Sequence, residues 1–390
     1  MNRTPNRTAA LARCYAAFLL SGMGSLMVGS LLPYLRAAYD LDYGFSGLLL
    51  SAQPVGNLIA TLLAGVLPLY LGRRRSVLLL TVWMPVAYLL FSTASLPVLL
   101  LAACFCTGLA RGGGANFCNV SVSTLAGENP GALNLLHGAF ALGALSAPFL
   151  LIGSERLTGS FRPGVFVMLA FALLQFALYC RASRDPLPEP ARGGLRGADY
   201  SFLRSVNFWV SGLILLFYIS AEYAITGWLV TYMKDSGVFT AAMSQMMSSL
   251  LWVDILLGRL LVASLSRRLS QNQLLLMGGA GFFAFFLVVF HAVSPVPAAI
   301  GIAGLGFFMA GIYPTTFSCV SRELAGNDLA ASMLIMLGSI GGIAAPALIG
   351  QIAARVGIVG GMRTVIVLTS VTFVLILLRV LLFRRKRKPD

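Results

Sequence analysis

Four ionisable side chains lie inside long apolar runs of this sequence: Arg111, His137, Glu222 and Asp254. On membrane-insertion scales, a charged residue in the middle of an apolar span costs about 3 kcal/mol. Such residues are retained mainly where they bind an ion or a polar ligand, or where they pair with one another. These positions are therefore the first candidates for binding and for proton transfer.

Glu222 is the candidate for reversible protonation. Tyr218 lies four residues before it and Thr226 four residues after it, so on a helix the three side chains share one face. Withdrawal of a carboxyl group from water favours its protonated form, which would let Glu222 accept and release a proton. A structural carboxylate that is hydrogen-bonded to these neighbouring hydroxyl groups is the alternative interpretation.

Arg111 requires an anion, because a guanidinium group keeps its proton in proteins. On a helix Arg111 and Asn119 fall on one face, with Asn116 close by, and three glycines follow Arg111 directly. Those glycines would let the helix bend or let another backbone approach closely. The anion is either a carboxylate or phosphate of a ligand, or a carboxylate of the protein that pairs with Arg111 during gating.

Helix-spaced polar side chains provide further hydrogen-bonding groups. Gln53, Asn57 and Thr61 recur every four residues, and Asn134 precedes His137 by three. Such groups either bind a polar solute or join helices, and Trp228 either stacks on a ligand ring or packs in the core. The candidates for solute binding are Gln53, Asn57, Arg111, Asn116, Asn119, Asn134, His137, Tyr218 and Trp228. Asp254 and Arg259, five residues apart, are expected to form part of a cytoplasmic gate.

The composition identifies the class of protein. Of 390 residues, 58% are hydrophobic and only 11% are charged, and the mean hydropathy is +0.86. Soluble domains contain roughly 25% charged residues, so soluble, disordered and fibrous proteins are excluded. The net charge of +15 does not indicate nucleic-acid binding, because the basic residues form short clusters between apolar runs. The six cysteines lie in or beside apolar runs, where small core residues are expected.

The apolar runs predict an all-α integral membrane protein with twelve transmembrane helices in two six-helix bundles. Inside a bilayer, backbone groups must be satisfied within each segment, and the two-residue alternation of a membrane β-barrel is absent from the sequence. The predicted helices cover residues 12–38, 44–70, 76–94, 97–123, 131–153, 162–181, 206–233, 240–263, 271–291, 296–320, 329–354 and 360–383. The first run is too long for the core of a cleavable signal peptide.

The basic residues predict the orientation and the domain boundaries. With the N-terminus in the cytoplasm, twenty Lys and Arg residues fall on the cytoplasmic side and six on the outer side, as the positive-inside rule requires. We expect an N-terminal bundle at 1–180, a polar cytoplasmic linker at 181–204, a C-terminal bundle at 205–383 and a basic cytoplasmic tail at 384–390. The expected location is the cell membrane, with both termini in the cytoplasm.

The two halves resemble repeats. A shift of 198 residues places Gly143 on Gly341 and Pro148 on Pro346. The same shift also aligns Asn129 with Asn327, Tyr34 with Tyr232 and Gly29 with Gly227. Parallel halves joined by a long middle loop are the layout of major facilitator transporters.

Three motifs carry a resemblance to that superfamily. Residues 65–75, GVLPLYLGRRR, resemble its loop signature G-x-L-x-D-x-x-G-R-R/K, although Leu69 stands where the family usually has Asp. Residues 134–148 are similar to the pattern N-x-x-H-x-x-x-x-x-G-x-x-x-x-P of fucose-permease-like facilitators, and residues 218–232 to their pattern Y-x-x-x-E-x-x-x-x-x-W-x-x-x-Y. The resemblance implies symport of a sugar with protons or sodium, and gating by Arg73 and Arg74.

The predicted function is therefore secondary active transport by alternating access, with proton-coupled movement of a sugar or similar small polar solute. Proton-driven efflux of drugs or lipophiles, and a non-transporting receptor or scaffold, are the alternatives. We expect no enzyme and no cofactor, because the sequence has no Walker glycine–lysine loop, no catalytic triad order and no metal-ligand cluster. The expected partners are the solute, a coupling proton or sodium ion and the lipid bilayer; we expect a monomer and no nucleic acid.

Overall fold

The computed structural model describes residues 7–126, 130–185, 200–324 and 328–383, all of which are helical or in short connections. Asn129, Asn327, most of the predicted linker and the predicted tail lie outside the described residues. The chain divides into two compact units, Met1–Gly194 with Ala241–Ser249, and Leu195–Thr240 with Leu250–Asp390. The boundaries predicted from the sequence stay a prediction.

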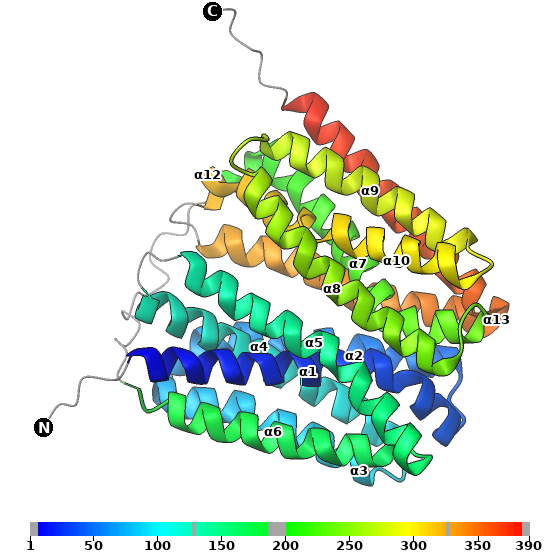
Figure 1. Cartoon of the computed structure of the whole chain (residues 1–390). Coiled ribbons are helices and arrows are strands. Elements are labelled where there is room, and N and C mark those ends of the chain that lie inside the picture. Colours follow the sequence, from blue (N-terminus) through cyan, green and yellow to red (C-terminus); the bar gives the residue numbers. More distant parts are fainter. Residues whose placement is uncertain (1–6, 127–129, 186–199, 325–327, 384–390) are drawn as a thin grey trace, which may run out of the picture. The chain divides into compact units, whose positions relative to one another are not determined.

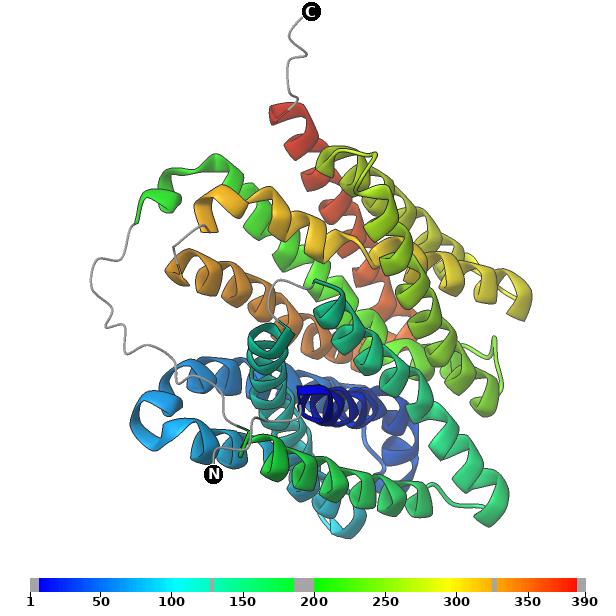
Figure 2. The same cartoon turned by 60° about the vertical axis from the view of Figure 1, so that its left-hand side comes forward.

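The first unit contains six long or medium helices (Figure 1). They are α1 (Arg7–Tyr39), α2 (Tyr43–Thr81), α3 (Trp83–Thr93), α4 (Pro97–Ala126), α5 (Pro130–Thr158) and α6 (Arg162–Ala182). Within this unit α1 packs against α4, α5 and α6, and α2 packs along α4 (Figure 2). The first nine residues of α8, Ala241–Ser249, group with this unit.

The second unit begins with a single 3₁₀ turn, η1 (Ser201–Arg204). Its helices are α7 (Val206–Asp235), α8 (Ala241–Leu265), α9 (Gln271–His291), α10 (Pro295–Met309), α11 (Ile312–Cys319), α12 (Ser321–Leu324) and α13 (Asp328–Leu382). Within this unit α7 packs along α13, and α9 packs against α10, α11 and α13. The core therefore lies between helices, with large apolar side chains such as Phe208 and Phe282 fully buried.

In the described part of the chain, ten helical segments are long and apolar enough to cross a membrane. The difference from the twelve predicted helices arises at two glycines. Gly72 (φ 72°, ψ 157°) interrupts α2, and Gly357 (φ 78°, ψ 167°) interrupts α13. Figure 1 shows the orange and red parts of α13 as two rods that meet at one end. Glycine tolerates positive φ, so one residue redirects the chain and helical bonding resumes at once.

The predicted repeat has a counterpart in the packing. A Cβ atom at Gly143 of α5 would collide with the carbonyl oxygen of Leu19 in α1. A Cβ atom at Gly341 of α13 would collide with the carbonyl oxygen of Leu216 in α7. The two glycines that the 198-residue shift aligns therefore serve the same purpose, which is to let two helix backbones approach closely.

Candidate functional site

Gln53 joins three helices of the first unit. Its side chain is buried, and Nε2 donates to the carbonyl oxygen of Ser25 in α1 at 2.9 Å and to Oγ1 of Thr107 in α4 at 3.0 Å. Thr107 in turn donates to the carbonyl oxygen of Cys104 at 2.6 Å. These bonds favour the role of Gln53 in joining helices over direct binding of a solute.

Arg111 lies half-buried on α4, among the polar residues predicted to bind a solute. Its guanidinium carbon stands 5.5 Å from the ring centroid of Phe140 in α5, within the range of a cation–π interaction. Asn57 and Asn116 are also half-buried, whereas Asn119 donates to the carbonyl oxygen of Ala115 in its own helix at 2.9 Å. The structure thus provides one guanidinium and two half-buried amides on α2 and α4.

The side chain of His137 is exposed on α5, and its ring meets that of Phe18 edge-on at 5.7 Å between centroids. Its helical neighbour Asn134 has a side chain outside the described residues. The structure therefore does not test the prediction that Asn134 and His137 form one polar face.

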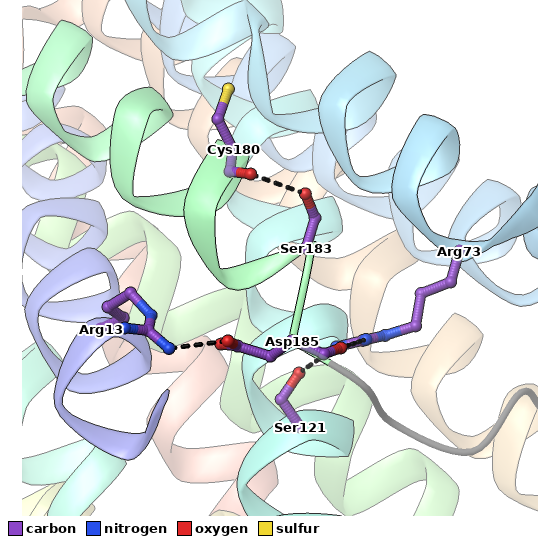
Figure 3. Close-up of polar contacts among 6 residues, drawn as sticks. All are labelled: Arg13, Arg73, Ser121, Cys180, Ser183 and Asp185. Atoms are coloured by element: carbon purple, nitrogen blue, oxygen red, sulfur yellow. Dashed lines mark hydrogen bonds and ion pairs between the residues drawn. The ribbon is translucent and has the colours of Figure 1, made fainter. Parts of the chain in front are cut away.

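Asp185, which lies just beyond the end of α6, contacts α1 through its carboxylate and α2 through its backbone carbonyl (Figure 3). Nη2 of Arg13 in α1 forms an ion pair with Oδ1 of Asp185 at 2.7 Å. Arg73 of α2 donates to the carbonyl oxygen of Asp185 at 3.2 Å and to Oγ of Ser121 in α4 at 3.0 Å. The side chain of Arg74 is exposed. Asp185 thus supplies an acidic partner near the arginines, although Leu69 replaces the usual aspartate.

Sequence reasoning did not select Asp185 or Arg13. The available signal was the first aspartate after the sixth apolar run, directly before a proline and within a stretch of arginines. That pattern shows an acid at the end of a helix, but it does not show which arginines lie beside it.

A polar cluster occurs in the second unit around α7. The Tyr218 hydroxyl is buried and donates to the carbonyl oxygen of Met309 at 3.0 Å. The charges of Glu222 and Arg259 both act on this hydroxyl, and the charge of Glu222 also acts on the hydroxyl of Tyr313 in α11. Glu222 itself is half-buried. The predicted stripe of Tyr218 and Glu222 is thus part of a cluster to which α8, α10 and α11 contribute.

Trp228 and Asp254 have different surroundings from those of Glu222. Trp228 is fully buried, and Nε1 donates to the carbonyl oxygen of Pro346 at 3.2 Å, which favours packing over stacking on a ligand. Asp254 has one buried carboxylate oxygen, Oδ2, without a hydrogen-bond partner among the described residues. Arg259 is exposed and does not pair with it. The predicted gating role of these two residues stays a prediction.

A second junction, which the sequence did not reveal, lies at the end of α13. Arg379 is 4% exposed, and it donates to Oδ1 of Asn272 in α9 at 2.5 Å and to Oδ1 of Asn207 in α7 at 3.1 Å. Asn207 donates in turn to Oε1 of Glu323 in α12 at 3.1 Å. Arg379 and Glu323 are therefore linked through an amide, so the buried cation has an indirect anionic partner.

Glu323 also accepts a hydrogen bond of 2.7 Å from Oγ of Ser205, the N-cap residue of α7. Partial burial acts to raise the pKa of Glu323, but the bonds from Ser205 and Asn207 and the nearby charge of Arg322 outweigh it and lower that pKa. The carboxylate thus helps to hold the start of α7, the helix that carries Tyr218 and Glu222.

Comparison with known proteins identifies the family. The model of the Major Facilitator Superfamily matches residues 14–346. The chain belongs to the Major Facilitator Superfamily. This membership confirms the resemblance inferred from the sequence, and it makes the chain a multi-pass membrane transporter and not an enzyme.

Individual relatives agree with this assignment. The glucose/mannose transporter GlcP of Bacillus subtilis is 24% identical over 351 residues, which cover 86% of this chain and 86% of GlcP. The nucleoside transporter NupG has the same fold, with a TM-score of 0.78 at 12% identity, over 97% of this chain and 100% of NupG. The fucose:proton symporter FucP of E. coli gives a TM-score of 0.65 at 20% identity, over 97% of this chain and 99% of FucP.

Proposed function

We propose that this member of the Major Facilitator Superfamily is a proton-coupled transporter of a sugar or a similar small polar solute, which works by alternating access. Twelve spans in two six-helix bundles belong to the proposal. They are supported by Gly72 and Gly357, which would divide two of the ten apolar segments close to the predicted boundaries. The proposed location is the cell membrane, with both termini in the cytoplasm.

The observation that carries the proposal is the cluster around Glu222. Glu222 is a half-buried carboxylate on a helix long and apolar enough to span the membrane. Because such a carboxylate destabilises the inserted helix, it is usually retained only where it has a function. Its neighbours include the hydroxyls of Tyr218 and Tyr313, which can hydrogen-bond to either protonation state. Glu222 is thus suited to carry one proton per transport cycle.

The choice of solute class is supported by the relatives. A glucose/mannose transporter is similar over most of the sequence, and a fucose symporter and a nucleoside transporter share the fold. All three named solutes carry several hydroxyl groups, which suit the amides of Asn57 and Asn116. A lipophile would offer these amides no hydrogen-bonding partner.

Glu222→Gln tests the coupling role. The amide keeps the shape and the hydrogen bonding of the carboxyl group but cannot change protonation state. The variant in liposomes should exchange D-glucose, D-mannose, L-fucose or uridine across the membrane, depending on which of them the wild type carries. It should fail to accumulate that solute under an imposed proton gradient.

Two outcomes would contradict the proposal. Accumulation by Glu222→Gln at the wild-type level would exclude Glu222 as the coupling carboxylate. Loss of exchange as well as accumulation would make Glu222 a solute ligand and leave sodium, or no ion, as the driver.

A further inference from the structure

Two buried thiols that have no role in the proposed transport lie between α1 and α4. Cys14 is 2% exposed and Cys118 is fully buried, and both belong to the apolar core of the first unit. Sγ of Cys118 lies 3.7 Å from the carbonyl oxygen of Cys14, and a side-chain hydrogen bond joins the two thiols. The packing of the helices thus brings together two cysteines that are 104 positions apart in the chain.

A phenolic hydroxyl completes this polar cluster. Oη of Tyr179 in α6 lies 3.8 Å from Sγ of Cys118, and the side chain of Tyr179 is 1% exposed. Cys118 has one weak S–H donor, and the acceptors around it are the sulfur and carbonyl oxygen of Cys14 and the hydroxyl of Tyr179. This S–H is therefore available to the sulfur of Cys14 when that sulfur carries a negative charge.

The thiol cluster lies beside the contacts that Asp185 makes with two arginines (Figure 3). Arg13 directly precedes Cys14 in α1. The charges of Arg13 and Arg73 both act on the thiol of Cys14, and the carboxylate of Asp185 acts on it in the opposite sense. Positive charges favour the thiolate, which is the nucleophilic form of cysteine. Nearby arginines and a second thiol in contact are the surroundings in which redox-sensitive cysteines are found.

Another pair of buried cysteines in the same unit provides a comparison. Cys104 and Cys106 are 0% and 6% exposed, and both lie in α4. Residues two positions apart on a helix do not face one another. This pair thus matches Cys14 and Cys118 in burial but differs from them in the orientation of its thiols.

We propose that Cys14 and Cys118 are an oxidation-sensitive thiol pair, which hydrogen peroxide converts into a disulfide bond between α1 and α4. Cys14, beside the arginines, reacts first, and Cys118 attacks the oxidised sulfur. This inference is independent of the proposed transport function.

The reaction balances with one molecule of hydrogen peroxide. The thiolate of Cys14 attacks one peroxide oxygen, so an S–O bond forms, the O–O bond breaks and hydroxide leaves. The sulfur of Cys118 then attacks the sulfur of Cys14, so the S–S bond forms, the S–O bond breaks and a second hydroxide leaves. The two thiol protons convert both hydroxides into water. The thiols lose two electrons, and the peroxide gains them.

The surroundings of the pair favour peroxide over other reactants. Peroxide is small and uncharged, which suits a buried thiol whose neighbour Arg13 has a side chain that is 27% exposed. Two thiols also suit a soft metal ion, but Arg13 and Arg73 repel a cation. The predicted topology places this end of α1 in the cytoplasm, where cysteines are kept reduced. The disulfide should therefore form only when peroxide is present.

Thiol counting after peroxide treatment tests the proposal. The purified full-length protein is treated with hydrogen peroxide, denatured and alkylated with N-ethylmaleimide, and its peptides are analysed by mass spectrometry. The wild type should lose two of its six thiols and show the peptides of Cys14 and Cys118 joined. Dithiothreitol should restore both thiols.

Two variants identify the pair. Cys14→Ala should form no disulfide, and a small apolar side chain at this core position should let the variant fold. The double variant Cys104→Ala/Cys106→Ala is the matched control, and it should lose two thiols to peroxide as the wild type does.

Three results would overturn the proposal. The first is retention of all six thiols by the wild type at a peroxide concentration that fully oxidises free cysteine. The second is loss of two thiols by Cys14→Ala at the wild-type rate, because another pair would then be the reactive one. The third is oxidation of Cys14 to a sulfinic acid without a disulfide, because Cys118 would then fail to reach it.

Discussion

At the scale of single residues, the structure separates polar side chains that join helices from those that remain candidates for binding. Gln53 and Trp228 each donate to the backbone of another helix. Arg111 and Glu222 are half-buried, with Phe140 beside the first and the hydroxyl of Tyr218 within reach of the charge of the second, and their roles stay predictions. Arg111 and Glu222 are therefore better targets for tests of transport than Gln53 and Trp228.

Arg111 should be essential for transport. Arg111→Ala should abolish solute uptake into liposomes while expression stays near the wild-type level, because the cation serves a ligand or a gate and not the core. Arg111→Lys should restore little, because an ammonium group cannot form the two parallel hydrogen bonds of a guanidinium. Arg355→Ala, which removes an exposed arginine, is the control and should transport normally. Normal uptake by Arg111→Ala would remove this residue from the site.

At the scale of elements, the two units fasten the end of their last helix in similar ways. In the first unit, Arg73 donates to the carbonyl oxygen of Asp185. In the second, Asn272 donates to the carbonyl oxygen of Phe383 at 3.2 Å. The shift of 198 residues that relates the halves places Asp185 on Phe383. The accepting carbonyl thus lies at equivalent positions of the two halves, while the donor is the guanidinium of Arg73 in one unit and the side-chain amide of Asn272 in the other.

The start of α7 should lose stability in acid. Since the pKa of Glu323 is lowered in the folded protein, its contribution is fully present above the ordinary glutamate value of roughly 4.3 and is lost as the pH falls through the lowered value. Glu323→Gln should be less stable than the wild type at pH 7 and should approach it in acid. Thermal unfolding in detergent between pH 7 and 3 checks this. A pH-independent difference between the two proteins would contradict the role of the charge.

At the scale of the whole molecule, the distribution of basic residues should fix the orientation in the membrane. Both termini should be cytoplasmic, because twenty of the Lys and Arg residues fall on that side of the predicted topology and six on the other. A reporter that is active only outside the cytoplasm, fused after Asp390, should remain inactive, whereas the same reporter fused after Leu157 should be active. Activity of the C-terminal fusion would exclude an even number of spans.

The sequence by itself determined the helical membrane class, the approximate positions of the spans and the superfamily. These properties are local, because a long apolar segment must satisfy its own backbone in lipid and so becomes a helix. The chain changes direction at Gly72 and Gly357, and both residues lie between helices predicted from the sequence. Glycine and nearby charged residues indicate such positions in the sequence. The break between α10 and α11, inside the helix predicted at 296–320, was not predicted, because apolar length alone does not distinguish a continuous span from a broken one.

Only the tertiary structure decided which polar groups meet. Asp185 lies between Arg13 and Arg73, and Tyr218 bonds to Met309, because particular helices pack side by side. Residues far apart in the chain gain or lose a partner through that packing, and periodicity gives the face of a helix but not its neighbour. The physical reason is that a polar group in an apolar interior forms hydrogen bonds only with donors or acceptors within about 3 Å of it. The fold decides which groups lie within that distance.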